Sequence, residues 1–156
     1  MELGLFMQPV HRAEKPWATA LAEDRESVLL AEKLGFSEVW IGEHFSTKAE
    51  QIPSPLMFLA SLIEQTSTIR FATGVINLPY HHPVIVAAET AQFDQMSGGR
   101  LILGFGPGGL MSDAELFGME DMPERYRVAM ESIDIILALW NADAPLSFDG
   151  EHFPMT

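Results

Sequence analysis

The chain of 156 residues contains no cysteine, which excludes disulfide frameworks, thiolate metal sites and cysteine nucleophiles. The absence of disulfides suits the cytoplasm, which is the expected location. Long apolar runs are also missing, since none approaches the roughly 18 residues that a membrane-spanning helix needs. The first residues, MELGLFMQPV, lack the basic segment that begins a signal peptide. The sequence therefore predicts no membrane partner.

Cationic side chains are scarce, with nine Lys and Arg against 22 Asp and Glu and a formal net charge of −13. Such an acidic chain argues against nucleic acid as a partner. An anionic ligand would have to bind through backbone N–H groups or a helix N-terminus. Apolar residues, in contrast, make up 47% of the chain and charged residues only 20%. We therefore expect a globular chain with one sizeable core.

The stretch from Arg70 to Gly109 organises the rest of the chain. Residues 71–77 and 101–105 are short apolar runs of the kind that form buried strands. Between them, the Ala-rich segment 84–96 is typical of a helix that covers a sheet. Two such strands joined through a helix make a right-handed βαβ unit, and hence a parallel sheet.

The same alternation of strand and helix runs along the whole chain. We expect strands at residues 2–6, 36–41, 71–77 and 101–105, and helices at residues 17–34, 55–65, 84–96 and 123–140. Four strands, each followed by a helix, indicate the α/β class. The arrangement is either an open doubly wound sheet or part of a (β/α) barrel. The tail from residue 141 onward holds turn residues and little to bury.

Functional residues of parallel α/β proteins gather at the carboxyl ends of strands and in the loops that follow. His44 stands in such a loop. It is either a general acid or base, because histidine titrates near neutrality, or an ordinary loop histidine. His81 and His82 are interpreted as ordinary loop residues, and no metal site is expected. Asp94 and Arg100 flank a glycine turn at the opposite end of the strands and are expected to be structural.

Gly104, Gly106 and Gly109 match the spacing G-x-G-x-x-G of dinucleotide-binding loops. That motif requires a helix to begin directly after the second glycine. Here Pro107 stands inside the motif, and the next helical segment is cut off at Gly118. The match is therefore interpreted as a glycine-rich loop after the fourth strand, and not as a dinucleotide site.

Several pieces of the sequence resemble one known family in their order and spacing: LGLF, LGFSEVWIGEHF, TGVINLPYHHPVIVAAE, FDQMSGGRLILGFGPGG and ERYRVAMESIDII. That family is the luciferase-like flavin-dependent monooxygenases. The resemblance implies that residues 1–141 are the N-terminal half of a TIM-barrel domain, the first four βα units of a (β/α)8 barrel. Residues 142–156, with FDGEHF, resemble the start of an insertion, after which the barrel is truncated.

The resemblance also implies a function. Family members use reduced FMN, supplied by a flavin reductase, and O2 to oxidise a small apolar organic substrate. His44 falls on the family's functional histidine, which is implicated in handling the flavin peroxide. The implied cofactor-binding residues are Gly74, Val75, Ile76, Gly106, Pro107 and Gly108, with a cis peptide bond at Gly74–Val75. Two alternatives stay open: a deazaflavin-dependent oxidoreductase of the same superfamily, and a non-catalytic flavin-binding or assembly module.

The resemblance ends after the fourth βα unit. The family's main phosphate-binding segment and its substrate-covering loop belong to the later half. We therefore expect an N-terminal fragment of a longer enzyme, in preference to a half barrel completed by pairing or a remnant that no longer catalyses, and the activity of the fragment alone stays open. Four units would leave two sheet edges and an apolar interior uncovered, which favours a homo-oligomer.

Overall fold

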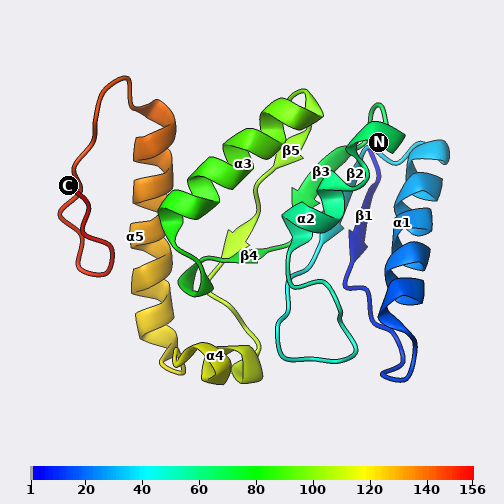
Figure 1. Cartoon of the computed structure of the whole chain (residues 1–156), viewed down its shortest axis with the longest axis horizontal. Helices are drawn as coiled ribbons and strands as arrows, with labels where there is room; N and C mark the ends of the chain where they lie inside the picture. Colours follow the sequence, from blue (N-terminus) through cyan, green and yellow to red (C-terminus); the bar gives the residue numbers. More distant parts are fainter. Residues whose placement is uncertain (1) are drawn as a thin grey trace. The chain divides into compact units, whose positions relative to one another are not determined.

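The computed structural model describes residues 2–156, and its helices and strands alternate as expected (Figure 1). The elements in chain order are β1 (Gly4–Met7), α1 (Trp17–Lys33), β2 (Glu38–Ile41), α2 (Pro55–Ala60), η1 (Ile63–Gln65), β3 (Arg70–Thr73), β4 (Ile76–Asn77), η2 (Leu78–Tyr80), α3 (Pro83–Ser97), β5 (Leu101–Ile102), β6 (Phe105–Gly106), α4 (Met111–Phe117) and α5 (Met122–Asn141). The chain divides into two compact units. The first comprises Met1–Ile76 and Phe93–Gly104, and the second comprises Asn77–Gln92 and Phe105–Thr156.

Strands β1, β2, β3 and β5 form one sheet in that order, and all neighbouring strands are parallel. The register pairs Met7 with Ile41 and Ile41 with Thr73, so the carboxyl ends of three strands meet at one edge. The short strands β4 and β6 form a separate two-stranded sheet. The predicted α/β class is thus confirmed.

The core of the first unit lies between the sheet and helices α1 and α2. Val39, Ile41 and Phe71 project from the sheet and are fully buried in one cluster with Val28 of α1 and Leu59 of α2. Burial of apolar side chains is worth about 25 cal/mol per Å², which makes this cluster the main source of stability in the unit. The strand side chains between these positions point to the opposite face of the sheet.

Two predicted strands and one predicted helix are shorter than expected. The apolar run 71–77 is split into β3 and β4, and the run 101–105 is split into β5 and β6. The predicted helix 55–65 ends as α2 at Ala60 and continues as the tighter turn η1. The hydroxyl of Ser61 donates to the carbonyl of Phe58 at 2.7 Å. Such side-chain hydrogen bonds compete with the regular helical pattern, which a count of apolar residues does not register.

Arg100 and Asp94 act structurally, as predicted. The guanidinium of Arg100 donates to the hydroxyl of Thr66 at 2.9 Å and to the carbonyl of Ile63 at 3.1 Å. The carboxylate of Asp94 accepts the N–H of Leu101 at 3.4 Å. Both side chains therefore tie the turns at the amino ends of the strands to the sheet.

A single carboxylate organises the turn into β3. Oxygen Oε1 of Glu32, near the end of α1, accepts backbone N–H groups from Ser67 at 2.8 Å, Thr68 at 2.7 Å and Ile69 at 3.0 Å. Partial burial by itself raises the pKa of this carboxyl. The N–H donors of Thr68, Ile69 and Ser67 together outweigh that effect, so the pKa lies below its ordinary value of 4.5.

Replacement Glu32→Gln is expected to lower the free energy of unfolding at neutral pH by about 1–2 kcal/mol, because the three N–H groups lose a charged acceptor that is still partly open to water. Since the pKa is depressed in the folded state, the stabilisation is present above the unfolded value near 4.5 and is lost as the pH falls through the folded value. Urea denaturation from neutral pH to about pH 3 measures this, and the wild-type and variant curves should converge in acid.

Glu26 offers the matched control, because it lies on the same helix at an exposed position. Glu26→Gln should change the free energy of unfolding by less than about 0.5 kcal/mol at every pH. A loss of stability in Glu32→Gln that stays constant across the pH range would contradict the assignment of this contribution to the ionised carboxylate.

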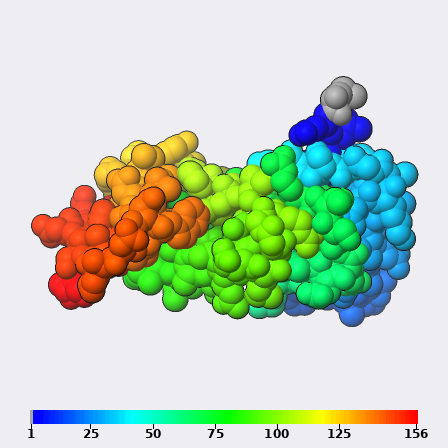
Figure 2. Space-filling model, turned by 90° about the horizontal axis from the view of Figure 1, so that it is seen from above, coloured from blue at the N-terminus to red at the C-terminus, as the bar shows by residue number. Residues whose placement is uncertain are grey.

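In the second unit, residues 151–153 of the tail are hydrogen-bonded to α5. The carboxylate of Glu131 accepts the N–H groups of Glu151 at 3.0 Å, His152 at 3.0 Å and Phe153 at 2.7 Å. The tail (red) accordingly lies against α5 (orange) in Figures 1 and 2. As expected, no side chain of residues 142–156 is fully buried, and these hydrogen bonds from Glu131 hold the tail in place of apolar burial.

Candidate functional site

The carboxyl edge of the sheet brings three loop starts together. The N–H of Gly42, directly after β2, donates to the carbonyl of Met7 at 3.1 Å, and the N–H of Gly74, directly after β3, donates to the carbonyl of Ile41 at 2.7 Å. A Cβ added to Gly42 would lie 3.3 Å from Cγ of Gln8. The backbone at this edge is therefore closely packed.

The peptide bond Gly74–Val75 is cis, so the geometry that the resemblance implied is confirmed. A Cβ added to Gly74 would lie 3.0 Å from Cε2 of Phe6 and 3.3 Å from Cβ of Trp40. Phe6 belongs to the sheet face opposite the core, where it is 59% exposed. Only glycine fits at position 74 without displacing these two aromatic side chains.

His44 lies two residues after Gly42, at the start of the loop formed by residues 44–53. Its side chain is 20% exposed, and atom Nε2 lies 3.1 Å from Oε2 of Glu50, whose side chain is 17% exposed. Its backbone N–H is directed to the carbonyl of Ile52 at 3.5 Å. The imidazole is thus paired with a carboxylate from its own loop in a place with limited access to water.

The loop of His44 packs against the segment that joins β1 to α1. Val10 and Glu50 form an antiparallel bridge, and the indole N–H of Trp17 donates to the carbonyl of Gln51 at 2.8 Å. Between the two segments lies a cavity of about 460 Å³. It is lined by Ala13, Lys15, Trp17, His44, Phe45, Thr47, Lys48, Glu50, Gln51 and Pro53. Its walls carry one imidazole, one carboxylate and two ammonium groups.

A second histidine cluster lies in the segment that joins β1 to α1, and the sequence analysis did not identify it. Nε2 of His11 lies 2.9 Å from Oδ1 of Asp24, and Nδ1 of His11 accepts from Nζ of Lys15 at 3.2 Å. Asp24 is buried on α1. A signal was present in the sequence: Asp24 falls on the helical face of Leu21 and Val28, where a charge needs a partner.

The glycine-rich loop lies in the second unit, except for its first glycine. Gly108 has φ of +81°, and a Cβ there would lie 2.6 Å from Oη of Tyr80. Tyr80 stacks on Phe117 with ring centroids 4.7 Å apart. Helix α4 begins only at Met111. The helix that a dinucleotide motif requires directly after Gly106 is therefore missing from this loop, in agreement with the sequence interpretation.

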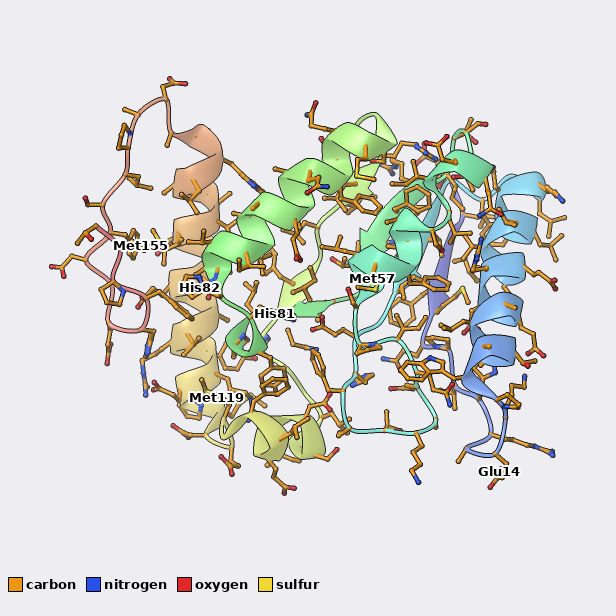
Figure 3. The ribbon with its side chains drawn as sticks, in the orientation of Figure 1. Glu14, Met57, His81, His82, Met119 and Met155 are labelled. Carbon is orange, nitrogen blue, oxygen red and sulfur yellow. The ribbon has the colours of Figure 1, made fainter. Side chains whose placement is uncertain are left out.

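His81 and His82 lie just before α3 (Figure 3). Nδ1 of His82 accepts the N–H of Val84 at 3.3 Å. The rings of His82 and Phe153 pack edge-on, with their centroids 5.2 Å apart. Among residues 2–156 there is no group of three or more His, Asp or Glu side chains placed to hold a metal ion. Within the same residues no helix has the length and apolarity to cross a membrane.

Of the residues proposed from the sequence, His44, Gly74, Val75 and Ile76 lie in the first unit, around the carboxyl edge of the sheet. Gly106, Pro107 and Gly108 lie in the second unit. Glu50, Lys15 and Trp17 were not singled out beforehand. Lys15 and Trp17 come from a segment far from His44 in the sequence, and the position of Glu50 depends on the conformation of the loop 44–53.

A parallel α/β sheet with an imidazole and close-packed glycines at its carboxyl edge is the arrangement of an α/β enzyme whose loops bind the ligand. The family model for luciferase-like monooxygenases matches residues 1–156, so the chain belongs to that family. The family consists of monooxygenases and related oxidoreductases.

Curated relatives match over nearly the whole chain. Identity is 38% to 4-hydroxyprotoasukamycin monooxygenase of Streptomyces nodosus subsp. asukaensis, over 99% of this chain and 42% of that protein. It is 40% to limonene 1,2-monooxygenase of Rhodococcus erythropolis, over 87% of this chain and 35% of that protein. An F420-dependent glucose-6-phosphate dehydrogenase of Amycolatopsis mediterranei is 28% identical over 83% of this chain and 40% of its own length.

Among solved structures, the oxygenating constituent of 3,6-diketocamphane monooxygenase from Pseudomonas putida, in complex with FMN, superposes with a TM-score of 0.92 at 27% identity. The match covers 99% of this chain and 42% of that one. The chain therefore spans about two fifths of the length of these relatives, and its fold is similar to that of the luciferase-like monooxygenases.

Proposed function

We propose that the protein is a flavin-dependent monooxygenase that uses reduced FMN and O2 to oxidise a small apolar organic compound. The observation that carries the proposal is the position of His44, paired with a carboxylate beside the edge of the sheet that contains the cis peptide bond. The family match over residues 1–156 and the FMN complex of the diketocamphane enzyme support it. Because that enzyme is an oxygenating constituent, we propose a separate flavin reductase as partner.

The residues present fit a flavin. Gly42 and Gly74 carry no side chains of their own, which lets a flat ring approach their backbone, and Phe6 and Trp40 pack close to Gly74. Because the chain carries a net charge of −13, the phosphate of FMN would depend on local backbone N–H groups or a helix N-terminus. We propose that the flavin is held by Gly74, Val75, Ile76, Gly106, Pro107 and Gly108.

When bound, reduced FMN supplies the electrons that activate O2. The chain's own residues orient the ring, and the imidazole of His44 holds or moves a proton beside it. Nε2 of this imidazole lies 3.1 Å from Oε2 of Glu50.

We also propose that residues 1–141 correspond to the first four βα units of a (β/α)8 barrel and residues 142–156 to the start of an insertion. The share of the relatives that the chain covers supports this correspondence. Exposure of Phe6 on the sheet face opposite the core favours a homo-oligomer, which sedimentation velocity tests. A cytoplasmic location is proposed, supported by the absence of cysteine.

The test is an anaerobic titration of the purified protein with reduced FMN and, in parallel, with reduced deazaflavin, followed by admission of O2 with limonene or a bicyclic diketone as probe. Binding of FMN with formation of an oxygenated product supports the proposal. Preference for the deazaflavin with hydride transfer and no oxygen insertion would support the alternative that the F420-dependent relative suggests. Flavin binding without turnover of either kind would indicate a flavin-binding module.

A further inference from the structure

We propose that Glu50 is a positioning residue, which sets the orientation and the tautomer of the His44 imidazole. The proposal rests on the proposed function, because it matters for turnover only if His44 handles a proton. Its basis is geometric: Nε2 of His44 and Oε2 of Glu50 are 3.1 Å apart.

The pair lies where a charge-assisted hydrogen bond is effective. The two side chains are only 20% and 17% exposed, so water competes weakly for either partner. A carboxylate accepts and cannot donate, so Nε2 of the neutral ring must carry the hydrogen. The other ring nitrogen, Nδ1, then has the lone pair. An imidazolium formed at His44 is stabilised by the carboxylate of Glu50.

Glu50 is held in place by contacts other than the one with His44. Its backbone forms an antiparallel bridge with Val10, and the carbonyl of the preceding residue, Ala49, accepts the N–H of His11 at 2.8 Å. On the other side, the indole of Trp17 binds the carbonyl of Gln51 at 2.8 Å. The loop is therefore fixed on both sides of Glu50. The carboxylate of Glu50 can orient the imidazole of His44 because its own position does not depend on that imidazole.

The same loop supplies a matched control. The side-chain amide of Gln51 donates to the carbonyl of Lys48 at 2.9 Å, so Gln51→Ala loosens the loop without removing a group from His44. Glu50→Ala removes the carboxylate. Glu50→Gln keeps one acceptor oxygen of nearly the same size and serves as the conservative replacement.

The first measurement is the ¹⁵N NMR spectrum of the two ring nitrogens of His44 in the uniformly labelled protein without flavin. The wild type is expected to show one protonated and one unprotonated nitrogen, with Nε2 carrying the hydrogen. Glu50→Ala should shift both signals toward the average of the two tautomers. Glu50→Gln should retain most of the wild-type pattern, and Gln51→Ala should retain all of it.

The second measurement is steady-state turnover with FMN. Glu50→Ala should lower kcat about 10-fold while KM and the Kd for FMN stay within about 2-fold, a loss typical of residues that orient a functional histidine. Unchanged His44 signals in Glu50→Ala would overturn the proposal, as would an equal loss of kcat in Gln51→Ala. The NMR pattern of His44 can depend on Glu50 while a variant without His44 keeps full turnover. That result would confirm the pairing of His44 with Glu50 and refute the proposed role of His44 in turnover.

Discussion

Replacement His44→Ala is expected to lower kcat about 100-fold or more, while the Kd for reduced FMN stays within about 2-fold. General acid or base catalysis by a positioned side chain contributes about 10²–10⁴ in rate, and alanine removes the group entirely. Flavin affinity should persist because the proposed ring contacts come from backbone at Gly74–Val75 and from the glycine-rich loop. Single-turnover kinetics with pre-reduced flavin separates binding from chemistry.

His82→Ala is the matched control, since His82 makes its described contacts with Val84 and Phe153 and not with the loop of His44. Its turnover should stay within about 2-fold of the wild type, and thermal unfolding should show that both variants are folded. If His44→Ala retains full turnover with intact flavin binding, His44 is an ordinary loop histidine, the other interpretation that the sequence allowed.

The second large effect is expected at Gly104, where alanine should lower the free energy of unfolding by about 3 kcal/mol. A Cβ there would lie 2.2 Å from the carbonyl oxygen of Thr73 and 3.2 Å from Cζ3 of Trp40. Backbone would have to move, because the N–H of Gly104 donates to Oγ1 of Thr73 at 3.0 Å and its carbonyl accepts the N–H of Ile76 at 2.9 Å. Overpacking of this kind costs about 1–3 kcal/mol, and lost hydrogen bonds add to it.

Gly109 provides the control within the same G-x-G-x-x-G match. No atom lies within 4 Å of a Cβ built on it, and its φ is not in the left-handed region. Gly109→Ala should change the free energy of unfolding by less than about 0.5 kcal/mol in urea denaturation. Equal stabilities of the two variants would show that Gly104 is not the packing position that the geometry indicates. The motif alone does not show that a side chain would clash at Gly104 and fit at Gly109.

The boundaries of α1 and α3 and the start of α2 were predictable because their signals are local. The structure places α1 at Trp17–Lys33 and α3 at Pro83–Ser97, within a residue of the ranges expected from apolar spacing. Ser54 caps α2 by accepting the N–H of Met57 at 3.3 Å, and Pro55 occupies the first turn. Each of these features depends on residues within one helical turn of the boundary.

Strand ends were less predictable, because they depend on pairing partners that the sequence does not identify. The interruption after Thr73 falls at the cis bond Gly74–Val75, which the family resemblance implied and apolar patterning did not. The end of β5 at Ile102 follows its register with Ala72, the last pair between β3 and β5. Within a continuous apolar run, the sequence pattern does not show where a strand ends.

By itself, the sequence determined the α/β class, the order of strands and helices, the acidic charge and the position of His44 after the second strand. These follow from composition and from periodicity over a few residues. Only the tertiary structure decided that Glu50 is the carboxylate facing His44, that His11 pairs with Asp24, and that Gly104 admits no side chain. The physical reason is that pairing of the parallel strands brings Gly104 against Thr73, while the packed conformation of the loops sets which side chains meet His44 and His11, and no local pattern encodes these contacts.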